Sequence, residues 1–91
     1  MDAIHAAAEL FGALSHPGRL HVLVLLEQHQ PRTAGELQEG TGMERTALSH
    51  QLKILRQSRL VTRTRDGRRQ FYQLTDEHVA HLVRDLSLIH I

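Results

Sequence analysis

The spacing of apolar residues along this chain changes once, near residue 60. Between residues 44 and 57, leucines recur at intervals of four and three residues, which is the repeat of an amphipathic helix. Residues 60–65 instead alternate one by one, and Asp66-Gly67 follows as a strong hairpin-turn signal. Residues 68–74 then return as a second strand. The sequence therefore predicts a helix followed directly by a β-hairpin.

The other helices are predicted from their start signals. Ser15 is a candidate cap for a helix with Pro17 in its first turn. Thr33 and Glu36 have the spacing of a capping box, and Thr75 is a candidate cap for the last helix. The predicted order is helix 3–14, a helix from 17 to before Pro31, helix 33–40, a turn, helix 44–57, the hairpin and the last helix. This order predicts a mainly α fold with a β-hairpin wing.

The chain of 91 residues is expected to form one small domain over 1–91. Domains of this size are often stabilised by association, by a metal or by disulfides. The absence of cysteine excludes disulfides and thiolate metal sites, so partner subunits or a nitrogen and oxygen metal site remain. The sequence shows neither a leader peptide nor an apolar run of membrane-spanning length, so we expect a soluble, cytoplasmic protein without a membrane partner.

The positive charge of the chain is concentrated in one block. Residues 44–69 contain eight basic and two acidic side chains, a balance of +6, although the whole chain has a net charge of only +1. Residues 1–43 and 70–91 are both acidic in balance. A localised basic block is the footprint expected of a surface that binds nucleic acid.

The helices at 33–40 and 44–57, joined by a turn that contains glycine, form a predicted helix-turn-helix whose second helix can enter the major groove. With the leucines facing inward, the candidate DNA contacts of that helix are Arg45, Thr46, Ser49, His50 and Lys53. The candidate contacts of the hairpin, with the DNA backbone or the minor groove, are Arg63, Arg65, Arg68 and Arg69. Together, these elements inside the basic block favour binding to double-stranded DNA.

Residues 7 to 85 resemble the ArsR/SmtB family of winged-helix repressors, in the segments ALSHPGRLHVLVLLEQ, TAGELQEGTGMERTALSHQLKILRQSRLV and TRTRDGRRQFYQLTDEHVAHLVRD. The most specific parts are LSHQLKIL and RDGRRQFYQL. The resemblance implies a homodimer on a palindromic operator, released when a metal or another inducer binds. The family often has glycine where this chain has Arg59, and that glycine would end the helix in a left-handed conformation. We therefore expect either a small loss of stability at Arg59 or a slightly different helix end.

The resemblance also implies metal sites. One kind uses cysteines in the recognition region, where this chain has Leu48 and Ser49 and no cysteine. Another kind lies on the last helix and takes an Asp-x-His pair from one subunit and a second pair from the other. Asp76 and His78 match the first pair, and these ligand types suit Zn(II), Co(II) or Ni(II). Such an ion would act as an inducer, and the fold is not expected to require a cofactor.

The second ligand pair does not occur at the family's spacing. The next histidine of the pattern follows eleven residues after His78, where this chain has Ile89. His81 and Asp85 share the helix face of His78 and could complete an irregular site. The tail LSLIHI, residues 86–91, breaks the helical pattern, so we expect the natural chain to continue instead as a longer, histidine-bearing helix.

The first and last helices each have an apolar face that a single small domain would leave partly bare, and such faces often mark interfaces. Their residues are Ile4, Ala7, Leu10 and Phe11 on the first helix and Val79, Leu82, Val83 and Leu86 on the last. These faces predict a dimer formed through the two helices, as the resemblance implies.

The sequence predicts a sequence-specific transcriptional repressor released from its operator by a divalent metal. One alternative is a regulator of the same family with a different inducer or none. Another is a metal-binding or protein-interaction module that does not use DNA. The chain has neither a recognisable nucleophile with its base nor a phosphate-binding loop, so an enzyme is not expected. The sequence does not specify the inducer, the operator or the target genes.

Overall fold

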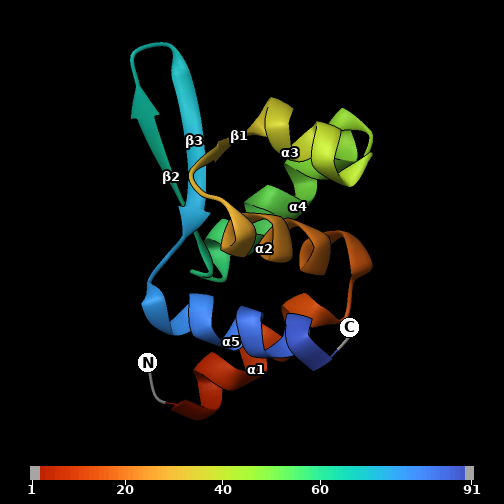
Figure 1. The fold of residues 1–91 in the computed structure, drawn as a ribbon, viewed down its shortest axis with the longest axis vertical. Coiled ribbons are helices and arrows are strands. Elements are labelled where there is room, and N and C mark those ends of the chain that lie inside the picture. Colours follow the sequence, from red (N-terminus) through yellow and green to blue (C-terminus); the bar gives the residue numbers. More distant parts are fainter. Residues whose placement is uncertain (1–2, 90–91) are drawn as a thin grey trace.

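The computed structural model describes residues 3–89, and these form helices with a small antiparallel sheet. The elements are α1 Ala3–Leu14, α2 Pro17–Gln28, β1 Arg32–Thr33, α3 Ala34–Thr41, α4 Arg45–Gln57, β2 Val61–Asp66, β3 Arg69–Leu74 and α5 Glu77–Ile89. The β2–β3 hairpin, called the wing below, projects from one end of the molecule, and α1 and α5 lie at the other end (Figure 1). The predicted mainly α fold with a hairpin wing is confirmed.

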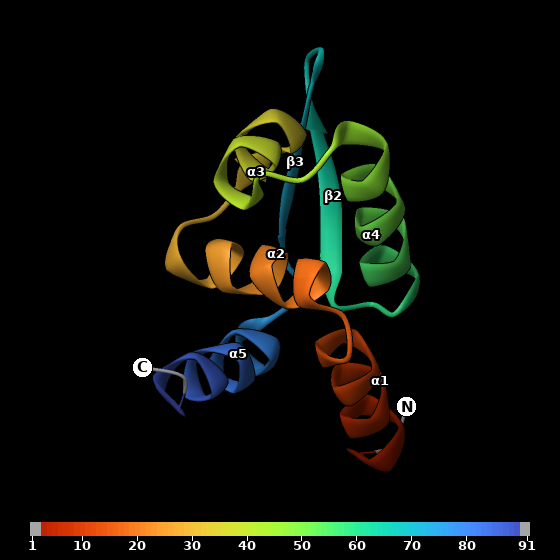
Figure 2. The same ribbon diagram turned by 90° about the vertical axis from the view of Figure 1, so that its right-hand side faces the viewer.

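The core is built around α2, which crosses the middle of the molecule between the α3–α4 pair and the α1–α5 pair (Figure 2). Leu23 and Leu26 of α2 are fully buried there. The predicted leucine stripe of α4 is also buried and packs in the same cluster. Because this stripe fixes the inner face of α4, it also determines which side chains face solvent.

The sheet has the strand order β1-β3-β2, and the short strand β1 was not predicted. β1 has only two residues, which pair antiparallel with Tyr72 and Phe71 of β3. The hairpin turn also differs slightly from the prediction. Asp66 still pairs with Arg69, so the two loop positions are 67 and 68, and Gly67 takes the first of them with a φ of 64°. Glycine adopts this left-handed conformation without a steric cost.

The predicted cap of α2 is wrong, because the helix begins at Pro17 and its N-cap is the residue just before it. His16 accepts a hydrogen bond from the Gly18 N–H at its Nδ1, at 3.0 Å. The Ser15 hydroxyl instead donates backward to the carbonyl oxygen of Gly12, at 2.6 Å. The capping box of α3 is confirmed, since both of its side-chain-to-backbone hydrogen bonds are present.

The predicted cap of α5 is wrong for the same reason. The Asp76 carboxylate accepts a hydrogen bond from the Val79 N–H at 2.9 Å, so the aspartate directly before Glu77 caps the helix. The hydroxyl of Thr75 lies 3.3 Å from that of Thr62 instead. The helical pattern was also expected to break after Asp85, yet α5 runs on to Ile89. The rest of the tail, residues 90 and 91, lies outside the described residues.

Arg59 follows the C-terminus of α4 in a left-handed conformation, with a φ of 61°. The Leu60 N–H donates to the Leu55 carbonyl and the Arg59 N–H to that of Arg56, both at 3.0 Å. This pair of hydrogen bonds is the Schellman motif, whose left-handed position favours glycine. The free-energy cost expected at Arg59 therefore has a structural cause: in the left-handed conformation its Cβ lies too close to the backbone.

Replacing Arg59 with glycine is expected to raise the free energy of unfolding. A left-handed non-glycine residue costs about 1–2 kcal/mol, and the greater unfolded-state freedom of glycine offsets part of that gain. We expect a net gain of about 0.5–1 kcal/mol, measured by urea unfolding. Arg59→Ala is the matched control, because it removes the charge and keeps the Cβ. An equal gain in both variants would show that charge, and not backbone strain, is responsible.

Candidate nucleic-acid interface

The outer face of α4 carries the side chains predicted to contact DNA. Burial of the leucine stripe turns the opposite side of the helix to solvent, and all five predicted residues are exposed: Arg45, Thr46, Ser49, His50 and Lys53. Their guanidinium, hydroxyl, imidazole and ammonium groups can exchange hydrogen bonds with bases and phosphates. The four arginines predicted in the wing are also exposed.

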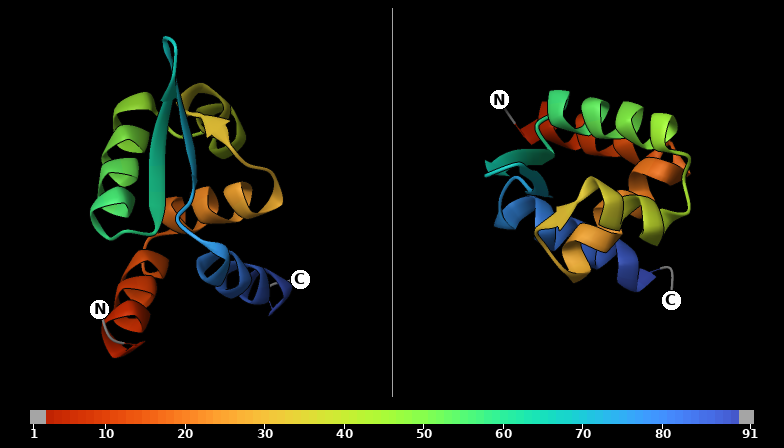
Figure 3. Two further views of the ribbon diagram at one scale, coloured as in Figure 1. Left: turned by 90° about the vertical axis from the view of Figure 1, so that its left-hand side faces the viewer. Right: turned by 90° about the horizontal axis from the view of Figure 1, so that it is seen from above.

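A hollow of about 430 Å³ separates α4 from the wing and α3. Arg45 and Ser49 of α4 line it, together with Arg63 of β2. Gln38 of α3 and Gln70 of β3 also line it, and sequence reasoning missed both. The alternation of residues 68–74 predicts on which face of its strand Gln70 lies. It does not predict which helix packs next to that face. Figure 3 shows α3 and α4 on either side of the hairpin. Thr46, His50 and Lys53 do not line this hollow.

The four arginines of the wing lie in different surroundings. Arg65 donates from its Nε to the carbonyl oxygen of Gly67 at 3.1 Å, within the hairpin turn. The Arg69 guanidinium lies 5.2 Å from the centre of the Phe71 ring, which is a cation–π contact. Arg63 lines the hollow, and Arg68 is in the turn at the tip. The wing therefore offers one arginine next to α4 and others along its length.

Glu44 occupies the N-terminus of α4, where a phosphate would otherwise be favoured. Its carboxylate accepts a hydrogen bond from the Ala47 N–H at 3.1 Å. Hydrogen bonds from the backbone at Thr46 and Ala47 hold the pKa of Glu44 below its usual value, so it is ionised at neutral pH. This ionised carboxylate makes the N-terminus of α4 less favourable for a phosphate, so basic side chains are the candidate phosphate contacts of this region.

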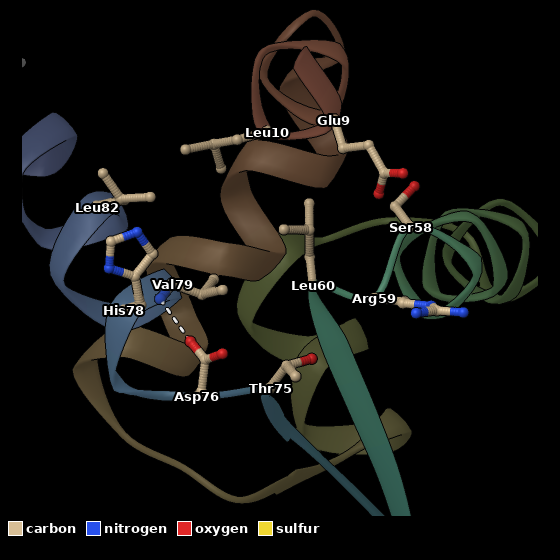
Figure 4. Close-up of a pocket in the computed structure, with 10 residues that line it drawn as sticks. All are labelled: Glu9, Leu10, Ser58, Arg59, Leu60, Thr75, Asp76, His78, Val79 and Leu82. Carbon is tan, nitrogen blue, oxygen red and sulfur yellow. Dashed lines mark hydrogen bonds between the residues drawn. The ribbon is translucent and has the colours of Figure 1, made fainter. Parts of the chain in front are cut away.

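The candidate metal ligands lie along α5 and do not gather in one protomer. Asp76 uses one carboxylate oxygen as the helix cap, and the His78 ring points toward Leu82 (Figure 4). His81 lies 3.8 Å from the Glu77 carboxylate. Within residues 3–89, no three histidine, aspartate or glutamate side chains are close enough to hold a metal together. His81 and Asp85, which could complete an irregular site with His78, do not form such a cluster within the described residues of one protomer.

His78 and Asp76 border a second hollow, of about 270 Å³, between α1, the start of α5 and the end of α4 (Figure 4). Its walls are mostly apolar and include Leu10 and Leu60. A tetrahedral zinc site takes four ligands. One protomer offers two of them here, so a complete site would need donors from a second chain.

The family model described as bacterial regulatory protein, arsR family, matches residues 16–63, which is more than half of the chain. The match covers α2, α3 and α4 and reaches into the wing.

The chain belongs to the ArsR family.

This ArsR-family chain is 42% identical to the HTH-type transcriptional regulator NmtR of Mycobacterium tuberculosis, over 98% of its own length and 72% of that protein. It is 38% identical to a transcriptional repressor SmtB homolog of Synechocystis, over 96% of its own length and 65% of that protein. The chain thus spans about two thirds of the length of these relatives.

Solved structures share the fold of this ArsR-family chain. Mb0332 of Mycobacterium bovis, a homodimeric winged helix-turn-helix DNA-binding domain, superposes with a TM-score of 0.84 at 32% identity, covering 96% of this chain and 80% of that one. The transcriptional repressor BigR of Xylella fastidiosa gives a TM-score of 0.84 at 36% identity, covering 93% and 86%.

The apolar faces of α1 and α5 in this family member are partly used inside the protomer. Leu10, Val79 and Val83 belong to the faces that were expected to be partly bare, but these three residues are buried in the core. Ile4 and Phe11 of α1 remain 79% and 67% exposed. Leu82 of α5 is 37% exposed.

Among the described helices, none has the length and apolar character needed to cross a membrane.

Proposed function

We propose that this chain, as one winged helix-turn-helix domain over residues 1–91, is a sequence-specific DNA-binding transcriptional repressor. The observation that carries the proposal is the hollow that Arg45 and Ser49 of α4 line together with Arg63 of the wing. Side chains on α4 can read base edges in the major groove while the wing contacts the adjacent backbone. Arg65, Arg68 and Arg69 would add contacts along the wing.

The repressor is proposed to act as a homodimer on double-stranded operator DNA. The exposed apolar residues of α1 support this, because Ile4 and Phe11 have no place in the core of the protomer. The homodimeric state of the related Mycobacterium bovis domain supports it as well. A two-fold dimer would place two copies of α4 about one turn of DNA apart, which matches a palindromic operator.

Release by a divalent metal is the proposed regulation. Asp76 and His78 of one protomer would supply two ligands for Zn(II), Co(II) or Ni(II), and a second chain would supply the rest. The ion would bridge the two protomers, because each of them would coordinate it. The alternative is an inducer of another kind or none, which is favoured by Ile89, because the second ligand pair of the family's pattern has a histidine at that position. A metal-binding or interaction module without DNA is a further alternative.

The test is fluorescence anisotropy of the protein on DNA from its own promoter, at two salt concentrations, with Zn(II) and then with EDTA. Salt-sensitive binding that zinc weakens and EDTA restores would support a metal-responsive repressor. DNA binding that zinc does not change would support the DNA-binding function and would favour a different inducer or none. An absence of binding by a protein that is dimeric in the assay would contradict the proposed function.

Replacing Asp76 with asparagine is expected to abolish the zinc effect and leave DNA binding and stability nearly unchanged. Asparagine caps helices about as well as aspartate, so the hydrogen bond to Val79 can persist while the charged ligand is lost. His78→Gln should behave in the same way. Co(II) absorption would report metal binding independently of DNA. A full zinc response in both variants would exclude these residues as ligands.

A further inference from the structure

Gln51 is an unusual residue for the inner face of α4. It is 6% exposed, and among the side chains that the structure describes it is the one buried residue of the polar and charged types. Its neighbours on the helix, Leu48, Leu52 and Leu55, are all apolar and buried. Burying an amide has a free-energy cost unless its hydrogen bonds are made. The contacts of Gln51 therefore explain how the residue is accommodated.

Arg19 of α2 supplies the main contact. Its Nη1 donates to Gln51 Oε1 at 2.9 Å. Its Nη2 donates to the carbonyl oxygen of Gly12 at 3.0 Å and lies 3.4 Å from the Ser15 hydroxyl. Gly12 and Ser15 are at the C-terminal end of α1. One guanidinium group thus joins the end of α1 to the inner face of α4, and these four residues are called the polar bridge below.

The orientation of the Gln51 amide follows from this contact. A guanidinium group only donates hydrogen bonds, so the amide oxygen must face Arg19. The amide nitrogen then faces His16 Nε2 at 3.4 Å. A neutral imidazole accepts at one nitrogen, and His16 already accepts at Nδ1 from Gly18. In that tautomer His16 Nε2 carries the hydrogen, so the two facing nitrogens are both donors and form no hydrogen bond. The hydrogen bond from Arg19 therefore holds Gln51 in place.

A directional hydrogen bond restrains α4 in a way that leucine contacts do not. Apolar attraction is non-directional, whereas a hydrogen bond weakens when its length or angle changes. Base-specific contacts require side chains held within about 0.5 Å of their productive geometry. Contacts between basic side chains and phosphates carry no sequence information and tolerate more movement. A bridge that fixes α4 would thus affect operator binding more than non-specific binding.

We infer that Arg19 and Gln51 are positioning residues for DNA recognition, which hold α4 at a fixed orientation relative to α1. The inference rests on the proposed function. It extends that function to two residues that lie off the DNA-facing surface. In the proposed dimer, α1 lies at the subunit contact, so the bridge would also set how the two copies of α4 are placed relative to each other.

The test compares operator DNA with a scrambled duplex of equal length, for the wild type, Gln51→Leu, Arg19→Met and the double variant. Each single change is expected to lower operator affinity about tenfold, because the free energy of one hydrogen bond to a charged group corresponds to at least that factor. Affinity for the scrambled duplex is expected to change by no more than about twofold. The double variant should bind the operator no more weakly than either single variant. Additive losses, or equal losses on both duplexes, would overturn the inference.

Gln51→Glu is the conservative variant, because it keeps an acceptor for Arg19. Its operator affinity is expected to stay within about threefold of the wild type, since one charge-assisted hydrogen bond replaces the original one. Failure of this variant to retain operator affinity would also count against the bridge. Arg19 is only half-buried, so Arg19→Met provides the comparison if Gln51→Leu does not fold. The wild type is measured first, and its failure to bind while dimeric would refute the proposed function itself.

Discussion

Operator affinity is expected to fall about 100-fold or more when Arg45 and Arg63 are both replaced by glutamine, because each lost arginine contact with a base or phosphate is worth about 1–3 kcal/mol. The two residues come from different elements, yet both line the hollow between α4 and the wing. Glutamine keeps most of the side-chain length and removes the charge. Neither residue belongs to the buried core, so the free energy of unfolding should change little.

The measurement is fluorescence anisotropy over a series of salt concentrations. If one of the arginines contacts a phosphate, the slope of log affinity against log salt should become shallower by about one unit. Arg84→Gln is the control for the loss of one arginine charge, compared with each single variant, because Arg84 lies on α5 and is paired with Glu27 at 2.9 Å. An equal loss in the control would mean that net charge, and not the hollow, governs binding.

Dimerisation is expected to be lost at micromolar concentration when Phe11 is replaced by lysine. Burying a phenylalanine side chain contributes about 1.5–3 kcal/mol, and a two-fold interface would use it twice. An unpaired charge buried at the same place would oppose association further. Phe11 is 67% exposed in the protomer, so the fold itself should tolerate the change.

Sedimentation velocity would report the mass of this variant, and anisotropy would report its affinity for a palindromic operator. Operator affinity should fall with the dimer, because the second half-site contact is no longer intramolecular. Gln28→Lys, at an exposed position at the end of α2, is the control for the added charge. A dimer of unchanged mass in the Phe11→Lys variant would show that α1 does not form the interface.

Features that depend on neighbours along the chain were predictable from the sequence. The leucine repeat of α4, the capping box at Thr33 and the change to strand alternation are all local patterns, and the structure confirms each of them. The cost at Arg59 was expected from the family resemblance, which often has glycine there, and the structure shows the left-handed residue of a Schellman motif at that position. Exposure of the candidate DNA-contacting side chains of α4 then followed from burial of the leucines.

Features that depend on distant parts of the chain were decided by the tertiary structure. Two residues of β1 are too few to form a recognisable pattern, and they become a strand only because β3 offers a free edge. Val83 appears bare when α5 is considered alone, but packing in the core buries it. Gln51 appears to be an ordinary polar residue until the fold brings Arg19, 32 positions away, to its amide. Local patterns fix which face of each helix is apolar, whereas only the packing of the helices fixes which residues meet across the core.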